Sequence, residues 1–150
     1  SYSRKLIGFH IFGAFPPTDF EDDKKYLQNF KNTAGENSIE LEEIEKIMKY
    51  KKLENYEFIK WDINKTIPEY CQNNEHLKIA LLHIDTDVYE PAVTILENMY
   101  DRIVKGGIIM FDDYGTFPGE TKAVDEFFAD KGLIIEKLPM SHIPSFIIKK

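Results

Sequence analysis

Residues 78–111 read KIALLHIDTDVYEPAVTILENMYDRIVKGGIIMF and predict a strand, a helix and a second strand in succession. The run at 78–84 is almost entirely apolar, which is typical of a strand covered on both faces. The helix is expected to open at Pro91, since proline suits a first helical turn, and to end at the glycine pair 106–107. The apolar run at 108–111 is the second strand. This spacing predicts a parallel strand pair, the unit of an α/β fold.

The same alternation of short apolar runs and helical patterns continues on both sides of this unit. The two closing strands are expected to form an antiparallel hairpin at one edge of a mostly parallel sheet, and residues 1–150 to form a single domain. Ser38 is expected to cap the helix that follows it. We predict further strands at 5–9, 56–61, 133–138 and 146–149, and helices at about 22–30, 38–50, 68–70 and 120–130.

Composition and charge exclude several classes of protein. The 150 residues include 26 acidic and 19 basic side chains, for a formal net charge of −7, so a nucleic-acid partner is not expected. No apolar run approaches the roughly 20 residues that span a bilayer, so a membrane partner is not expected either. The single cysteine, Cys71, cannot form an intrachain disulfide, which favours a reducing, cytoplasmic location.

Acidic side chains follow three of the predicted strands. Asp62 follows the strand at 56–61, Asp85 follows the strand at 78–84, and Asp112 and Asp113 follow the strand at 108–111. Ligands of open α/β sheets bind beyond the carboxyl ends of the strands. Carboxylates crowded there repel one another unless a proton or a cation intervenes, and oxygen-only ligands favour Mg²⁺ or Ca²⁺. We therefore expect Asp85, Asp112 and Asp113 to converge on one hard cation.

Other interpretations of these residues remain open. Asp87 could simply cap the following helix, and Asp112 and Asp113 could form a solvated turn. His83 is expected to be a core histidine, because it lies within an apolar strand. Tyr89 and Tyr114 flank the acidic residues and could line a pocket.

Four segments of the chain resemble the macrocin O-methyltransferase family. They read GFHIFGAFP (8–16), LHIDTDVYEP (82–91), GGIIMFDDYG (106–115) and KAVDEFF (122–128), and they occur in the order of the family. The resemblance implies a Rossmann-like class I methyltransferase fold and S-adenosylmethionine as the methyl donor. It also implies transfer to a sugar or glycoside hydroxyl with the help of a divalent metal such as Mg²⁺, and a possible homodimer.

The resemblance also implies roles for individual residues. Asp85, Asp112 and Asp113 match the metal-binding aspartates of the family, and Asp85 is expected to accept the proton of the acceptor hydroxyl. Asp62 matches an acidic residue near the adenine of the cofactor. His10 stands where the family carries a carboxylate that binds the ribose hydroxyls, and a histidine can also hydrogen-bond a hydroxyl.

The chain departs from the family in one large respect. Class I methyltransferases begin with a strand and a glycine-rich turn, whereas residues 1–150 contain no G-x-G and their first predicted strand resembles the second strand of the family. In the family that strand lies in the middle of the sheet, between the strands expected here at 5–9 and 78–84. We therefore expect the C-terminal portion of a longer enzyme or a reduced relative. The alternatives are a cofactor-less interaction or dimerisation module, and a hydrolase with the same acidic metal site.

Overall fold

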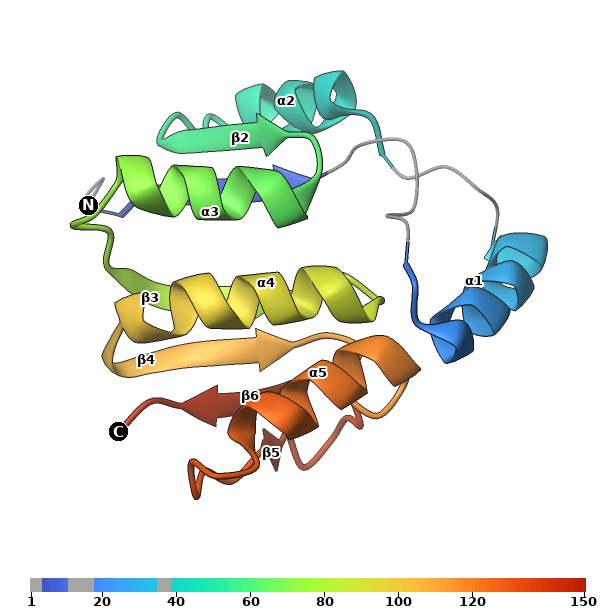
Figure 1. The fold of residues 1–150 in the computed structure, drawn as a ribbon. Coiled ribbons are helices and arrows are strands. Elements are labelled where there is room, and N and C mark those ends of the chain that lie inside the picture. The colour runs from blue at the N-terminus through green and yellow to red at the C-terminus, as the bar shows by residue number, and fades with distance from the viewer. Residues whose placement is uncertain (1–3, 11–17, 35–38) are drawn as a thin grey trace.

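The strands form two groups within the residues that the computed structural model describes, which are 4–10, 18–34 and 39–150 (Figure 1). One group pairs β1 (Leu6–His10) with β2 (Tyr56–Lys60) in parallel. The other has the spatial order β3-β4-β6-β5. It comprises β3 (Ile79–Ile84), β4 (Ile103–Phe111), β5 (Glu136–Lys137) and β6 (Ser145–Ile148).

The pairing of these strands confirms the predicted α/β fold. β3 and β4 are parallel, with Ile84 opposite Phe111 at their carboxyl ends. β6 runs antiparallel to both β4 and β5, so the C-terminal hairpin closes one edge of the sheet. Among the described residues, no strand pairing joins β1 to β3. The interruption falls where the family resemblance places an additional central strand.

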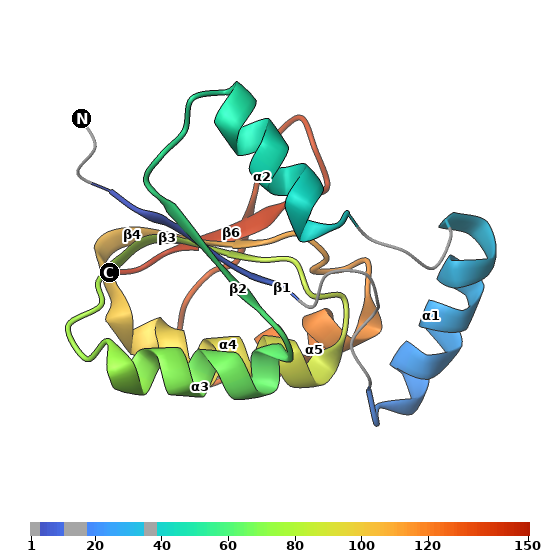
Figure 2. The ribbon, with the colours of Figure 1, turned by 90° about the horizontal axis from the view of Figure 1, so that it is seen from above.

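Helices lie on both faces of the sheet (Figure 2). α3, α4 and α5 cover one face, and α2 lies on the other, while α1 lies beyond the carboxyl ends of the parallel strands. None of the helices in the described ranges has the length and hydrophobicity that crossing a bilayer requires. The helix bounds are α1 (Glu21–Ala34), α2 (Leu41–Tyr50), α3 (Ile63–Asn73), α4 (Tyr89–Met99), the short η1 (Tyr100–Arg102) and α5 (Pro118–Phe128).

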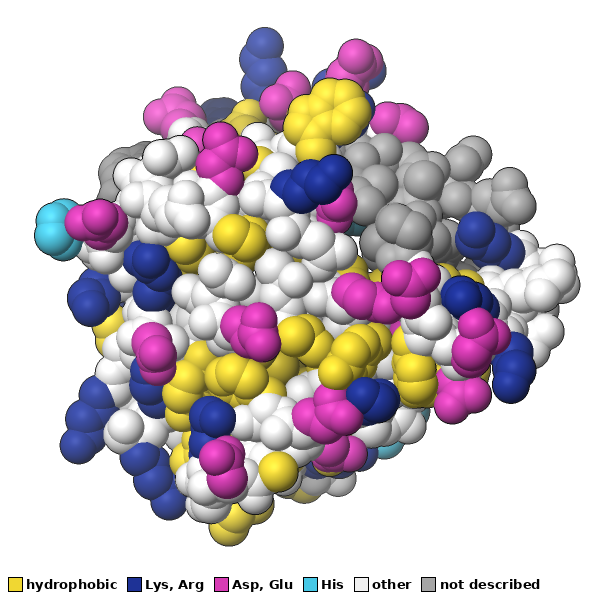
Figure 3. All heavy atoms as spheres, in the orientation of Figure 1, with side chains coloured by type: hydrophobic (Ala, Val, Ile, Leu, Met, Phe, Trp, Pro, Cys, Tyr) yellow, Lys and Arg dark blue, Asp and Glu magenta, His cyan; other side chains and the backbone are white. Residues whose placement is uncertain are grey.

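The core lies between the β3-β4-β6 strands and the helices α3, α4 and α5. Ile84, Ile109 and Phe111 point from the strands into it and meet Leu96 of α4 and Val124 of α5, all fully buried. Burying each such side chain contributes about 1.5–3 kcal/mol, so these contacts anchor the carboxyl ends of β3 and β4. The outer surface of the same helices carries hydrophobic side chains over α4 and α5 among acidic and basic ones (Figure 3).

The prediction that β3 is covered on both faces is wrong for the described residues. Leu82 and Ile84 are buried, whereas Leu81 is 56% exposed. In register with Leu81 lie Ile108 of β4 and, beyond it, Ile148 of β6, which are exposed as well. The apolar run therefore predicted the buried face of β3 correctly, while the second face is exposed in the described part of the chain.

The glycine pair at 106–107 lies inside β4 and does not end the preceding helix. α4 ends at Met99, and β4 then begins at Ile103. The register of β4 against β3 shifts between Ile79 and Leu81, and Gly106 adopts a φ of +77° within the irregularity. Glycine permits this conformation, so the same residues that suggest a helix stop accommodate a β-bulge.

Two further helix predictions differ in detail. α3 is longer than expected and contains Pro68. It begins after Asp62, whose Oδ1 accepts a hydrogen bond from the backbone N–H of Asn64 at 3.0 Å. α2 has Glu40 at its N-cap position, and the predicted cap Ser38 lies outside the described residues.

Candidate functional site

Three aspartates meet at the carboxyl ends of β3 and β4. Asp85, Asp87 and Asp113 each offer a carboxylate oxygen, and these oxygens lie within 4.8 Å of one another. The two strands are parallel neighbours that end in register, so their loops leave the sheet side by side. The sequence predicted Asp85 and Asp113 here, whereas it suggested Asp87 only as a helix cap.

The predicted third member, Asp112, points in another direction. Its Oδ1 lies 3.2 Å from Nε2 of His83, and both side chains are partly exposed. In the bend that follows β4, Asp113 is only 8% exposed, whereas the side chain of Asp112 is 38% exposed. The prediction that His83 is a core residue is therefore wrong, because its side chain is 45% exposed.

The backbone explains why Asp87 joins the cluster. Asp87 adopts a φ of +61°, a left-handed conformation that aspartate tolerates better than most residues. It does not cap α4. That role belongs to Asp23 of α1, whose Oδ2 accepts a hydrogen bond from the backbone N–H of Tyr89 at 2.9 Å. The carboxylate of Asp87 therefore remains at the aspartate cluster.

The electrostatics of the cluster favour a bound proton or cation. Burial, followed by the charge of Asp87, raises the pKa of Asp113 to about 8. Burial and then the charge of Asp85 raise the pKa of Asp87 to about 6. Oδ2 of Asp113 is buried and has no hydrogen-bond partner in the described part of the chain. A buried, unpaired carboxylate oxygen is costly, so it calls for a positive partner.

His10 and Asp62 lie at the carboxyl ends of β1 and β2. Burial lowers the pKa of His10, and the charge of Asp85 opposes this shift, so the ring lies within electrostatic reach of the cluster. One carboxylate oxygen of Asp62 is occupied in capping α3. Trp61, between the strand and this cap, has a φ of +104° and is 71% exposed at the same edge.

The two tyrosines that flank the aspartates are anchored to α5. The Tyr89 hydroxyl donates to Glu126 at 2.6 Å, and Nζ of Lys122 lies 3.9 Å from the centre of its ring. The Tyr114 hydroxyl donates to Asp125 at 2.8 Å, and burial together with this bond raises the pKa of Tyr114 to about 12. A cavity of about 460 Å³ lies between the start of α1 and α5, but neither tyrosine lines it.

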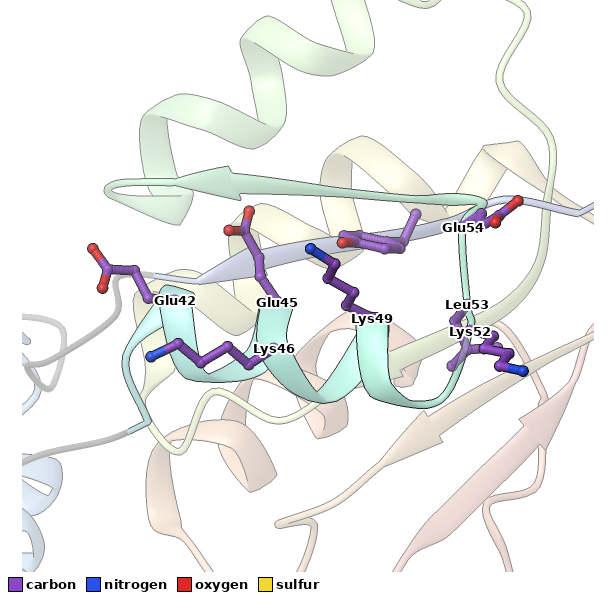
Figure 4. Close-up of a pocket in the computed structure, with 8 residues that line it drawn as sticks. Glu42, Glu45, Lys46, Lys49, Lys52, Leu53 and Glu54 are labelled. Carbon is purple, nitrogen blue, oxygen red and sulfur yellow. The ribbon is translucent and has the colours of Figure 1, made fainter.

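A larger cavity, of about 710 Å³, lies between α2 and β2 (Figure 4). It opens beside the amino end of β2, whereas the aspartates lie at the carboxyl ends of β3 and β4. Its lining mixes acidic side chains such as Glu42 and Glu45 with basic ones such as Lys46 and Lys49. These charges offset one another, so this cavity does not select an anion or a cation.

Comparisons with known proteins agree with this architecture. Demethyldecarbamoylnovobiocin O-methyltransferase of Streptomyces niveus is 39% identical over 51 residues, which are 34% of this chain and 20% of that protein. The O-methyltransferase NovP has a TM-score of 0.83 at 21% identity, and the calicheamicin methyltransferase CalS11 has 0.77 at 21% identity. Each of these two matches covers 99% of this chain and 61% of the other, so the chain spans about three fifths of their length.

A more distant structure shares the same fold. The MycE methyltransferase, solved with Mg, SAH and mycinamycin VI, has a TM-score of 0.52 at 12% identity over 97% of this chain and 44% of its own. The family described as macrocin-O-methyltransferase (TylF) matches residues 2–147. This chain is a member of the macrocin O-methyltransferase family.

Proposed function

We propose that this protein transfers a methyl group from S-adenosylmethionine to a hydroxyl of a sugar or glycoside. The observation that carries the proposal is the cluster of Asp85, Asp87 and Asp113 in a macrocin O-methyltransferase family member, at the sheet edge where α/β proteins bind ligands. Support for a sugar acceptor comes from CalS11, which is described as a TDP-rhamnose 3′-O-methyltransferase.

The residues of the cluster fit a divalent cation. The group contains carboxylates and neither histidine nor cysteine, which favours Mg²⁺ over zinc. A cation would neutralise the mutual repulsion that raises the pKa of Asp87 and Asp113, and it would provide a partner for the buried Oδ2 of Asp113. Asp112 is not in this group, and its Oδ1 lies beside Nε2 of His83. The Mg bound to MycE is consistent with such a site.

The bound cofactor and cation would supply different parts of the methyl transfer from those that the side chains of this protein supply. When bound, S-adenosylmethionine supplies an electrophilic methyl group, and a divalent cation supplies a Lewis acid that lowers the pKa of an acceptor hydroxyl. Asp87, which is half-buried, and Asp113, which is buried, would hold the cation. Asp85 is exposed, so it can both contact the cation and accept the proton of the acceptor hydroxyl. His10 and Asp62, at the carboxyl ends of β1 and β2, would hold the ribose and the adenine side of the cofactor.

The test uses the full-length protein, radiolabelled S-adenosylmethionine and TDP-rhamnose together with other nucleotide-linked sugars. We expect methyl transfer that EDTA abolishes and Mg²⁺ restores. Transfer that EDTA does not affect would remove the metal from the proposal. If calorimetry shows no binding of S-adenosylmethionine, the alternative of a cofactor-less interaction module gains support. The homodimer and the cytoplasmic location stay predictions, and sedimentation of the full-length protein tests the first.

A further inference from the structure

Glu120 is a fully buried acid in the first turn of α5, and the sequence did not single it out. Its side chain lies between the two loops that carry the aspartates. Oε1 accepts a hydrogen bond from the backbone N–H of Asp113 at 3.1 Å, and Oε2 accepts one from the backbone N–H of Thr86 at 3.4 Å. The backbone N–H of Glu120 itself donates to the carbonyl of Asp87 at 3.2 Å.

These three bonds reach both halves of the aspartate cluster. Thr86 lies between Asp85 and Asp87 in the loop after β3, and Asp113 lies in the loop after β4. Glu120 therefore joins the two loops through their backbones, and α5 sets the distance between them. Since both carboxylate oxygens of Glu120 accept backbone N–H groups, the side chain is engaged with the loops and is not among the three residues that could share an ion.

We propose that Glu120 is a positioning residue that holds Asp87 and Asp113 at the separation a divalent cation requires, without contacting the cation. This inference rests on the proposed metal site. Substitution of a residue that hydrogen-bonds to metal ligands, without contacting the metal itself, typically weakens metal binding by about 10–100-fold. A carboxylate suits this place because it offers two acceptors to two buried N–H groups, and each group would be costly to leave unpaired.

Two substitutions separate positioning from charge. Glu120→Gln keeps the size of the side chain but offers one acceptor oxygen, so one of the two backbone N–H groups loses its partner. Glu120→Asp keeps the charge and both acceptors but is one methylene shorter, so it cannot reach both loops. Glu97→Gln is the matched control, since Glu97 is an exposed acid on α4 and its substitution also removes one negative charge.

The experiment measures Mn²⁺ affinity of the full-length protein by calorimetry, and the Mn²⁺ signal by electron paramagnetic resonance. Both are recorded at one pH above 8, where Glu120 is ionised, and below the melting temperature of every variant. We expect both Glu120 variants to bind Mn²⁺ about tenfold or more weakly than the unsubstituted protein, with an altered resonance signal, and Glu97→Gln to bind normally. If Glu120→Gln does not fold, Glu120→Asp alone decides.

The failures of the two proposals can be told apart. If the unsubstituted protein and both Glu120 variants bind Mn²⁺ equally well, Glu120 only stabilises the fold and the positioning role is refuted while the metal site stands. If Glu120→Gln binds weakly but Glu120→Asp binds normally, a side chain that reaches both loops is not required for metal binding, which also refutes the positioning role. If the unsubstituted protein does not bind Mn²⁺, the proposed metal site is refuted, and the positioning role of Glu120 is refuted with it.

Discussion

The residues at the ends of β3 and β4 differ in the direction of their side chains, and this difference separates two candidate ligands. Asp87 points into the cluster with Asp85 and Asp113, whereas Asp112 pairs with His83. We predict that Asp87→Asn weakens Mg²⁺ binding about tenfold and more than Asp112→Asn does, as calorimetry of the full-length protein would show. The opposite order would return Asp112 to the ligand set.

The raised pKa values of these carboxyl groups also predict how stability depends on pH. Asp87 has a pKa of about 6, while Asp113 and Glu120 have values of about 8, against about 4 in the unfolded chain. Between about pH 4 and pH 8 the folded state therefore binds more protons than the unfolded state, so stability falls as the pH rises through this range.

Melting temperatures measured at several pH values in EDTA should show this decline, and Asp113→Asn should make it shallower. Added Mg²⁺ should stabilise the protein most above about pH 8, where the carboxylates are ionised. A melting temperature in EDTA that rises steadily from about pH 4 to pH 8 would be incompatible with the raised pKa values of Asp87, Asp113 and Glu120.

At the level of the elements, α1, α4 and α5 meet at one glycine. Gly119 lies in the first turn of α5, and a Cβ there would overlap with the carboxylate of Asp23 and the backbone nitrogen of Tyr89. We predict that Gly119→Ala lowers the free energy of unfolding by about 1–3 kcal/mol, because either α1 or α4 must move. Urea unfolding measures the loss, with Glu97→Ala on the exposed face of α4 as the control. Equal stability of the two variants would show that α1 is not packed against this turn.

The elements also show how far the sequence alone could reach. Apolar runs and helical periodicity predicted the order of strands and helices, the parallel pairing and the C-terminal hairpin. The prediction that the glycine pair ends a helix was wrong, because the left-handed backbone of Gly106 occurs in β-bulges as well as at helix ends. The sequence predicted Asp85 and Asp113 as site residues because each follows a strand. It did not predict Asp87, whose place in the cluster depends on its left-handed backbone. Nor did it predict Glu120, whose role depends on how α5 packs against the two loops.

Across the whole molecule, α3 connects the two groups of strands. Its Tyr70 meets Phe9 of β1 edge-to-face at 5.2 Å, and its carboxyl end is held from the other side by Arg102. Arg102 donates to the carbonyls of Cys71 and Asn74, at 2.9 Å each. The position of His10 relative to Asp85 therefore depends on this helix.

We predict that Arg102→Met destabilises the full-length protein by about 1–3 kcal/mol, since methionine keeps the apolar stem but leaves the carbonyls at the end of α3 without their donor. Urea unfolding followed by circular dichroism measures the change. Lys105→Met, at an exposed position of β4, is the control for loss of one positive charge. If both variants unfold at the same urea concentration, the guanidinium bonds contribute nothing to the attachment of α3.

Anomalous diffraction from crystals of the full-length protein soaked in Mn²⁺ tests the metal site most directly. We expect one peak at about 2.1 Å from carboxylate oxygens of Asp85, Asp87 and Asp113, with the Glu120 carboxylate still bound to the two loops. A peak coordinated by Asp112 in place of Asp87 would contradict the ligand set, and the absence of any peak among these aspartates would contradict the metal site itself.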